Sequence, residues 1–229
     1  MIELKSDENK IKTILDYYIL TNKLKDLVRT GWKRWGVKRE RVESVAEHIY
    51  GTCMLAVAIW SETLPEVNLS EVITMLVLHE TEENIISDIT PYDDEKKLKI
   101  KESGEKAVKA IFRGLVAKDV YFKLVHDFDT LATKEAVFAR KCDKLECDLQ
   151  ARLYSDQDCL KLENADSIKE DERILEYRAK GITDIADYFI LEDRKNFPDN
   201  DIFFKINKYI EGKNILKKGK KEWKTYFLE

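Results

Sequence analysis

The spacing of apolar residues along this chain predicts helices in nearly every segment. In residues 8–28, apolar side chains recur at the intervals of a helical face. A second helix is expected to open near Ser44 and to continue to Trp60. Ser44 and Glu47 are three residues apart, which is the spacing of a capping box. Residues 29–41, RTGWKRWGVKRER, separate the two helices, and we interpret them as a basic, aromatic loop containing two glycines.

A third helix is predicted to end in an unusual run of acidic residues. LPEVN, residues 64–68, has the composition of a turn, and Asn68 is placed to cap the helix that follows. That helix runs into MLVLHETEENIISD, residues 75–88, where an apolar stripe ends in His-Glu. Thr90-Pro91 then breaks the chain. A helix that served only for packing would not need a histidine and a glutamate at this point.

The rest of the chain continues the helical pattern. Segments at helical spacing lie at 95–116, at 119–127, from Thr133 to about Tyr154, and in two or three stretches between Asp166 and Glu211. Gly212 is a plausible stop for the last of them. Only 8 Gly and 3 Pro occur, which favours helices over a turn-rich sheet protein. We therefore predict an all-α bundle with a core over residues 1–155 and a helical C-terminal extension, 156–229, packed on that core.

Composition and charge exclude several classes of function. The net charge of −4 gives no general electrostatic argument for binding nucleic acid or a membrane. The five lysines between 217 and 224 are interpreted as a solvated end of the chain. The N-terminal segment MIELKSDENK is too charged for a signal peptide, and no apolar run is long enough to span a membrane. We expect a cytoplasmic protein with reduced thiols at its four cysteines, Cys53, Cys142, Cys147 and Cys159.

Two histidines and two carboxylates are the candidates for chemistry. His48 is expected in the first turns of its helix, and His79 ends a buried stripe and is followed at once by Glu80. Asp143 lies inside a predicted helix among small and apolar neighbours, where a carboxylate needs a hydrogen-bond partner or a metal. Such nitrogen and oxygen donors suit Mn, Fe, Co, Ni or Zn. Spacing alone does not decide, because a histidine on an apolar face is more often a core residue.

Two better-known metal motifs are excluded by the residues at key positions. A zincin requires His-Glu-x-x-His, but position 83 is Glu. Ferritin-like di-iron sites require Glu-x-x-His twice, but Val45 and Leu76 stand three residues before the two histidines.

The order of short motifs along the chain resembles a known family of hydrolases. RTGW is followed by ESVAEH (43–48), HE-x-x-E (79–83), SD-x-TP-x-D (87–93) and KCDKLECDLQA (141–151). This order, over about residues 20–155, is similar to that of the HD-domain metal phosphohydrolases, within them most to the 5′-deoxynucleotidase branch. The resemblance implies that His48, His79, Glu80 and Asp143 are metal ligands. Glu80 departs from the family, which has Asp there, but it keeps the carboxylate and adds one methylene.

The same resemblance implies roles for two further acidic residues. Glu83 matches the position that activates water or orients the leaving group. The residues alone also allow this, because a helix would place Glu83, four residues on, on the face of His79. Glu82 would then point to solvent. Asp88 matches the position that contacts the sugar 3′-hydroxyl, and the alternative is that Asp88 only caps the turn before Thr90-Pro91.

The basic, aromatic loop supplies the remaining candidates for substrate binding. Trp32 matches the family tryptophan that crowds the sugar 2′ position and so favours deoxyribose. Arg29, Lys33 or Arg34 could bring positive charge to a phosphate, and Arg29 is preferred because it adjoins the matched motif. We interpret Trp35 as a half-exposed aromatic residue without a role in the site.

The sequence therefore predicts a metal-dependent phosphohydrolase. The expected reaction is hydrolysis of a nucleoside 5′-monophosphate, favouring the deoxyribonucleotide, to nucleoside and phosphate. One alternative is another reaction at the same site, either nucleotide pyrophosphohydrolysis or phosphodiester hydrolysis. A second alternative is a metal- or nucleotide-binding module without turnover, with Glu80 marking lost catalysis. The resemblance also implies a homodimer acting on a small-molecule nucleotide, without nucleic-acid or membrane partners.

Overall fold

The computed structural model of the protein describes residues 6–88, 97–165, 168 and 170–216. Across these residues the chain is helical, and its one extended pairing is an isolated antiparallel bridge between Val28 and Ser44. The predicted all-α class is confirmed. No helix in the described part of the chain combines the length and apolar character needed to cross a bilayer. The predicted break at Thr90-Pro91 and the lysine-rich end lie outside the described residues.

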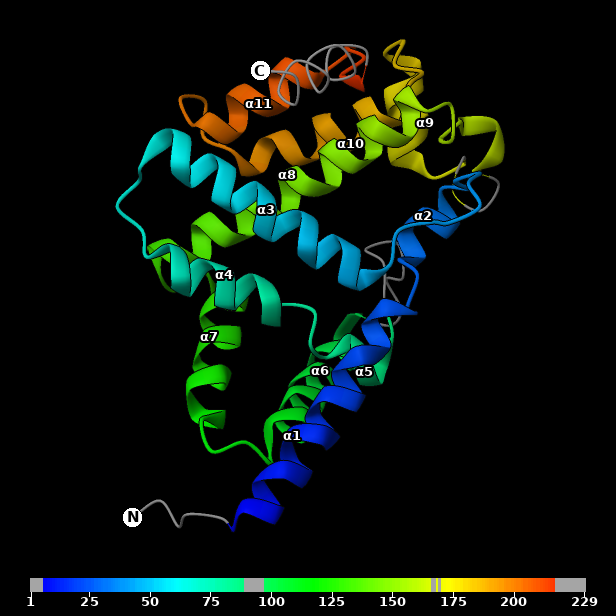
Figure 1. The fold of residues 1–229 in the computed structure, drawn as a ribbon. Helices are drawn as coiled ribbons and strands as arrows, with labels where there is room; N and C mark the ends of the chain where they lie inside the picture. Colours follow the sequence, from blue (N-terminus) through cyan, green and yellow to red (C-terminus); the bar gives the residue numbers. More distant parts are fainter. Residues whose placement is uncertain (1–5, 89–96, 166–167, 169, 217–229) are drawn as a thin grey trace, which may run out of the picture. The chain divides into compact units, whose positions relative to one another are not determined.

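The chain divides into two compact units, coloured along the sequence in Figure 1. The first unit comprises Met1–Thr30 and Glu43–Arg140, and the second comprises Gly31–Val42 and Lys141–Glu229. The division falls inside one long helix, so residues 141–155 group with the C-terminal part of the chain. The predicted organisation into a core to residue 155 and a packed extension stays a prediction.

Among the described residues, seven helical elements lie wholly in the first unit. They are α1 (Asp7–Thr21), the 3-10 helix η1 (Asn22–Lys25), α3 (Val45–Thr63), α4 (Leu69–Leu78), α5 (Glu83–Ile86), α6 (Lys97–Phe112) and α7 (Lys118–Thr130). The predicted capping box begins α3: the Glu47 amide donates to Ser44 Oγ at 3.2 Å, and the Ser44 amide donates to Glu47 Oε2 at 2.9 Å. Asn68 caps α4, as predicted, by accepting from the amides of Ser70 and Glu71.

The helix predicted to run through HETEE is interrupted. It ends at Leu78, and a turn separates it from α5, which begins at Glu83. The amide of Thr81 donates to the Leu78 carbonyl at 3.0 Å within this turn. If the helix continued, its carboxylates would lie at the negative, C-terminal end of the α4 dipole. Glu80 would also lie beside Glu83 on one helical face. Both arrangements are unfavourable. The prediction that Glu83 shares a helical face with His79 is therefore wrong.

The core of the first unit gathers around α6 and α7. Its buried members are Leu78, Val108, Ile111, Phe112 and Val125. Tyr17 and Leu20 of α1 pack against this cluster, so one face of α1 is attached to the core. The buried stripe of α3 and the apolar face of α4 (Val72, Met75 and Leu76) add to the core, and this stripe positions the first candidate ligand.

The second unit contains the C-terminal helices. Besides α2 (Thr30–Arg34), which begins at the unit boundary, and most of α8 (Lys134–Asp156), it holds η2 (Leu162–Asn164), α9 (Glu172–Ala179), α10 (Ile185–Asp193), η3 (Arg194–Asn196) and α11 (Ile202–Ile210). In the described residues between 168 and 211 there are three α-helices, in agreement with the predicted two or three. Gly212, with φ of 61°, lies just past the end of α11 as expected.

The basic, aromatic loop belongs to this second unit and is partly helical. Trp32 and Trp35 are 3% and 2% exposed, and the ring centroids of both lie within 5.3 Å of that of Phe189 on α10. Gly36 has φ of 66°, and a β-carbon there would meet the Asn164 carbonyl oxygen at 1.9 Å, so only glycine fits. The interpretation of Trp35 as half-exposed is therefore wrong. Sequence periodicity missed it because both tryptophans sit among charged residues and their partners lie about 150 residues away.

A buried polar network joins α8 to the C-terminal helices. Asn207 on α11 donates from Nδ2 to Asp148 Oδ2 at 2.7 Å and to the Ile190 carbonyl at 2.8 Å, and it accepts from Arg194 Nε at 2.8 Å. Asp148 is fully buried, and its Oδ1 has no hydrogen-bond partner among the described residues. Burial, reinforced by the nearby Asp193 carboxylate, raises the pKa of Asp148 well above its ordinary value.

This raised pKa makes a prediction about stability and pH. The folded chain keeps the Asp148 proton at pH values where the unfolded chain releases it, so stability falls as pH rises from about 4 toward the folded pKa. Replacing Asp148 with Asn removes this cost. We expect the variant to gain at least about 1 kcal/mol over the wild type at pH 8, or roughly 2–4 °C in Tm. The gain should shrink toward pH 4 in thermal melts. The exposed Asp199→Asn is the matched control, and equal effects of both variants would contradict the assignment.

Candidate metal centre

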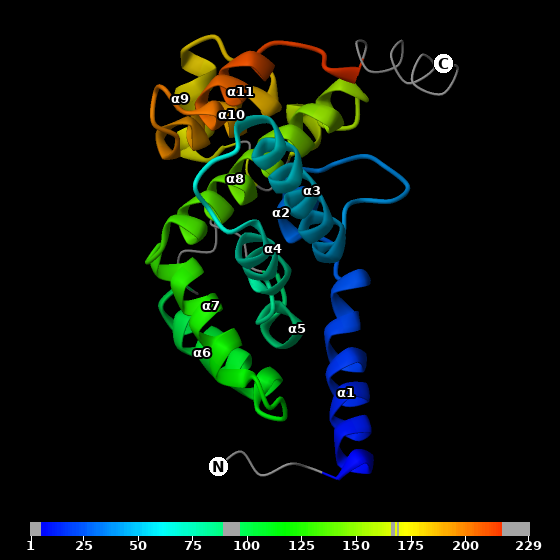
Figure 2. The same cartoon turned by 60° about the vertical axis from the view of Figure 1, so that its left-hand side comes forward.

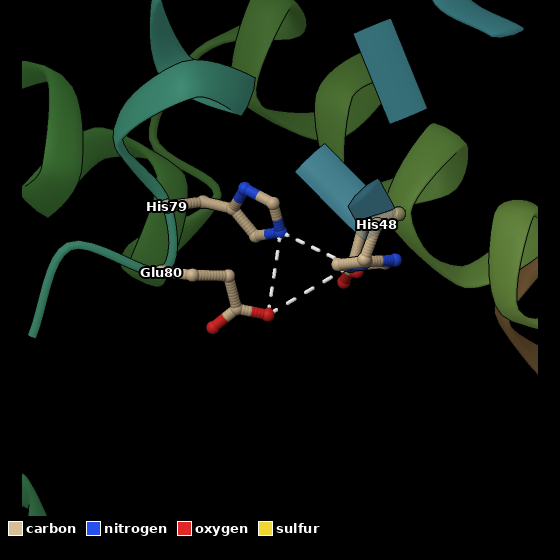
Figure 3. Close-up of side chains that lie close together, drawn as sticks. His48, His79 and Glu80 are labelled. Carbon is tan, nitrogen blue, oxygen red and sulfur yellow. Dashed lines mark hydrogen bonds and ion pairs between the residues drawn. The ribbon is translucent and has the colours of Figure 1, made fainter. Parts of the chain in front are cut away.

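Three candidate ligands of the first unit converge on one point. His48 lies on the buried stripe of α3. His79 is the C-cap directly after α4, and Glu80 follows it in the turn. The Nε2 atoms of the two histidines are 3.4 Å apart, and Glu80 Oε1 lies 3.4 Å from His79 Nε2 and 3.8 Å from His48 Nε2. Figure 3 shows the three side chains pointing toward one another. The group could hold a metal ion.

The orientation of His79 is fixed by its own helix. Nδ1 lies 2.6 Å from the Leu76 carbonyl oxygen, three residues earlier. A carbonyl can only accept, so Nδ1 carries the proton and the lone pair of Nε2 faces His48 and Glu80. The ring also packs against Phe128, with centroids 5.2 Å apart. A histidine held in this way is prepared to bind a cation through Nε2.

The spacing of the donor atoms fits a single transition-metal ion. Ligand atoms bound at about 2.0–2.1 Å lie roughly 2.9–3.4 Å from one another in octahedral or tetrahedral geometry. Two of the observed separations, 3.4 Å each, lie at the upper end of this range, and the third, between His48 Nε2 and Glu80 Oε1, is longer at 3.8 Å. Two imidazoles and a carboxylate are donors that suit Mn, Fe, Co, Ni or Zn. The extra methylene of Glu80 therefore does not keep its carboxylate from the cluster.

Arg29 brings a positive charge to the edge of the cluster. Its Nη1 lies 3.5 Å from Glu80 Oε1, and both side chains are largely buried. The backbone of Arg29 is held in place, because its amide donates to the Glu43 carbonyl at 3.0 Å beside the Val28–Ser44 bridge. Of the three cations considered for phosphate binding, Arg29 is the one that the first unit places beside the candidate ligands.

Glu83 reaches the neighbourhood of Glu80 from the start of α5. Its Oε2 is buried and has no hydrogen-bond partner among the described residues. Burial, together with the carboxylates of Glu80 and Asp88, raises the pKa of Glu83 to about 11, although Arg29 opposes the shift. A buried carboxyl group without a full set of partners, next to other carboxylates, is the arrangement that a nearby cation would relieve.

Glu82 points inward, whereas the sequence was interpreted to place it toward solvent. Its Oε2 is also buried without a hydrogen-bond partner in the described part of the chain. Burial, followed by the charge of Glu80, raises the pKa of Glu82 to about 7. The interpretation was wrong because it assumed a continuous helix, whereas the turn after His79 directs Glu82 inward.

Asp88 ties the acidic segment to the start of the RTGW motif. Its carboxylate accepts from the backbone amide of Thr30, and the Thr30 hydroxyl donates to the Asp88 carbonyl at 3.0 Å. Asp88 thus anchors the N-terminal end of α2 in addition to any contact with substrate. Sequence reasoning missed Thr30, although a threonine just before Gly-Trp is a common type of helix-start residue.

The two remaining candidates belong to the second unit. Asp143 lies on α8 between the buried residues Cys142 and Leu145 and is 5% exposed. A buried carboxylate in such surroundings needs a hydrogen bond or a cation, as the sequence indicated. Trp32 lies in the aromatic cluster with Tyr154 and Phe189, with ring centroids 5.3 Å from each. The structure thus brings four of the candidates together in the first unit: His48, His79, Glu80 and Arg29.

A match to a family model decides to which family this arrangement belongs. A model described as the HD domain matches residues 21–182, well over half of the chain. The chain belongs to the HD domain family.

Curated relatives of this HD domain protein carry a common name. The 5′-deoxynucleotidase HDDC2 of Dictyostelium discoideum is 30% identical over 151 residues, which cover 62% of this chain and 78% of the relative. Human 5′-deoxynucleotidase HDDC2 is 31% identical over 148 residues, covering 63% and 70%. The 5′-deoxynucleotidase hdd1 of Schizosaccharomyces pombe is 27% identical over 143 residues, covering 60% and 70%.

Solved structures show the same fold at lower identity. The PH0347 protein from Pyrococcus horikoshii OT3 aligns with a TM-score of 0.57 at 21% identity, covering 85% of this chain and 98% of that protein. A predicted metal-dependent phosphohydrolase from Magnetospirillum magnetotacticum MS-1 aligns with a TM-score of 0.55 at 21% identity, covering 78% and 95%. At this identity the likeness establishes the fold alone.

Proposed function

We propose that this HD domain protein is a metal-dependent phosphohydrolase that converts deoxynucleoside 5′-monophosphates to nucleoside and phosphate. The observation that carries the proposal is the convergence of His48, His79 and Glu80, with Arg29 beside them. A cation site next to a fixed guanidinium group suits a phosphate ester, because both groups offset negative charge on the phosphoryl oxygens. The names of the relatives, 5′-deoxynucleotidases at about 30% identity, support the same substrate class.

In this proposal four residues bind the metal: His48, His79, Glu80 and Asp143. Asp143 is included because it is a buried carboxylate on α8 in the position that the family motif assigns to a ligand. A divalent cation bound by these residues supplies a polarised phosphoryl oxygen and an acidified water molecule. Mn, Fe, Co, Ni and Zn all remain candidates for the ion, because each accepts this mixture of donors.

Three further residues have proposed roles toward the substrate. Glu83 accepts a proton from the attacking water, which requires its carboxylate form, and a nearby cation would lower its raised pKa in that direction. Arg29 binds the phosphate, releasing its contact with Glu80 to do so. The Asp88 carboxylate accepts a hydrogen bond from the Thr30 amide in the free protein. We propose that it contacts the sugar 3′-hydroxyl in the complex.

A panel of nucleotides tests the proposed reaction. Purified protein would be stripped with a chelator, reloaded with Mn, Co or Zn, and incubated with deoxy- and ribonucleoside monophosphates, triphosphates and a phosphodiester. We expect free phosphate from the deoxynucleoside monophosphates. Protein that retains metal and yet leaves every compound intact would indicate a binding module instead. Cleavage of the phosphodiester alone would indicate a phosphodiesterase.

Trp32 is proposed to set the preference for deoxyribose. Its indole would limit the space available to a ribose 2′-hydroxyl, so Trp32→Ala should admit ribonucleotides. We expect the ratio of kcat/KM for dAMP to that for AMP to fall by about 10- to 100-fold, the size of effect that a pocket achieves against one added group. The measurement is a ratio from one preparation, and it is therefore independent of the fraction of folded enzyme.

Trp35→Ala is the matched control for this prediction. Trp35 is as buried as Trp32 and packs on the same Phe189 ring, so both changes should reduce stability to a similar degree. Only the change at Trp32 should alter the sugar ratio. A wild-type enzyme without a deoxy preference, or an equal change from both variants, would show that Trp32 serves packing alone.

We also propose that the protein is cytoplasmic and acts as a homodimer. Its four cysteines are free thiols, as expected in a reducing compartment. Among soluble oligomers, symmetric pairing of two identical copies is the most frequent form of assembly.

A further inference from the structure

Helix α1 has a second apolar face that its own unit leaves uncovered. One face, with Tyr17 and Leu20, packs against the α6–α7 core. The opposite face exposes large apolar side chains at intervals of three and four residues. These side chains, named here the α1 stripe, are 53–65% exposed and comprise Ile11, Ile14, Leu15, Tyr18 and Ile19. Figure 2 shows α1 at the edge of the first unit, with no other helix of that unit on its outer side.

The size and regularity of the stripe distinguish it from ordinary scattered surface residues. Single exposed apolar residues are normal, but five in register on one helix form a continuous patch. Together they expose on the order of 500 Å², near the top of the range for the largest patch on a monomer. Two such stripes facing one another would bury on the order of 1,000 Å², which is the size at which a specific interface becomes plausible.

The charges at the two ends of the helix indicate which partner fits. Asp7 and Glu8 lie at the N-terminal end, and Lys23 and Lys25 lie in η1 directly after the C-terminal end. A second copy of the helix in antiparallel orientation would bring the acidic first turn, Asp7 and Glu8, beside the lysines of η1. Lys10, which pairs with Asp7 at 2.9 Å, and Lys12 follow that turn and partly offset its charge. A parallel copy would bring like charges together, which is unfavourable.

We propose that the α1 stripe is the surface through which two copies of this chain associate, with the two α1 helices antiparallel. If the two-fold axis passes at Leu15, then Ile11 of one copy lies opposite Ile19 of the other, and Asp7 lies opposite Lys23. An interface related by a two-fold axis uses the same patch on both copies, as this self-complementary stripe does. The proposal specifies the surface of the proposed homodimer and does not depend on the reaction or on the metal.

Light scattering on size-exclusion fractions tests whether two copies associate through the α1 stripe. The wild type is expected at twice the 26.9 kDa of one chain, and Ile14→Glu at 26.9 kDa under the same conditions. The matched control is Met54→Glu, because Met54 is also an exposed apolar residue of the first unit but lies on α3. This variant should remain dimeric. A monomeric wild type, a dimeric Ile14→Glu, or dissociation by Met54→Glu would each overturn the proposal.

Disulfide trapping tests the orientation. Leu15→Cys should cross-link rapidly to its own copy under mild oxidation, because Leu15 sits at the proposed axis. Ile11→Cys should not exceed the background of the wild type, since its counterpart Ile11 lies two turns away in an antiparallel pair. Cross-linking of Ile11→Cys at the rate of Leu15→Cys would instead indicate a parallel pair and would overturn the antiparallel arrangement. Neither assay requires a substrate, so a failure here is separate from a failure of the proposed reaction.

Discussion

An Asp143→Ala variant is expected to lose its bound metal and at least about 10³-fold in kcat/KM for a deoxynucleoside monophosphate. Loss of a ligand removes the polarisation that a cation contributes, which is worth several kcal/mol of the barrier. The measurement combines elemental analysis of the dialysed protein with initial rates of phosphate release. Asp143 is the proposed ligand that most needs this test, because it lies in the second unit whereas the other three proposed ligands lie in the first.

Asp148→Asn provides the control for this variant. Asp148 is buried on the same helix, five residues further on, and bonds to Asn207. Its replacement should leave metal content and kcat unchanged. If Asp143→Ala keeps its full complement of metal while its thermal melt shows a folded protein, then Asp143 is not a ligand and the set reduces to His48, His79 and Glu80.

A Glu83→Gln variant is expected to keep its metal and lose about 10²- to 10⁴-fold in kcat, the usual contribution of a general base. Glutamine has the shape of the side chain but cannot accept the proton. The structure gives Glu83 a buried oxygen without a hydrogen-bond partner among the described residues and a raised pKa, both of which a neighbouring cation would correct. Rates at saturating dAMP, with metal content measured on the same sample, separate loss of the base from loss of the ion.

Glu82→Gln is the matched comparison for Glu83→Gln. Glu82 adjoins it in sequence and also has a buried, unpartnered oxygen in the described part of the chain. Its pKa is raised as well, to about 7, so burial and a shifted pKa are common to both residues. We expect kcat within about tenfold of the wild type for Glu82→Gln. Equal losses from the two variants would mean that the acidic turn acts only by its total charge.

Local signals in the sequence predicted the elements that carry the candidate metal site. The Ser44–Glu47 capping box and the Asn68 cap each depend on residues within four positions of one another, and both form as expected. The apolar stripe of α4 ends at His79, as its periodicity indicated. Residues close in sequence determine caps and apolar stripes of this kind. A single sequence was therefore enough to predict that His48 and His79 lie near helix termini.

Features that depend on distant contacts could not be predicted. The turn between His79 and Glu83 contains no proline or glycine, so periodicity extended the helix through it and misplaced Glu82. The burial of Trp35 depends on Phe189, and the role of the C-terminal helices in packing the basic, aromatic loop was not foreseen. Apolar spacing also predicted α1 but not that its stripe would be exposed, because periodicity does not say what a face contacts.

One pair of reactions, followed for three products, tests the proposed activity directly. The chelator-treated protein, before and after addition of Mn or Co, would be given dAMP and dATP in parallel, and nucleoside, phosphate and pyrophosphate would be quantified. We expect metal-dependent formation of deoxyadenosine and phosphate from dAMP. Release of pyrophosphate from dATP, with dAMP left intact, would contradict it.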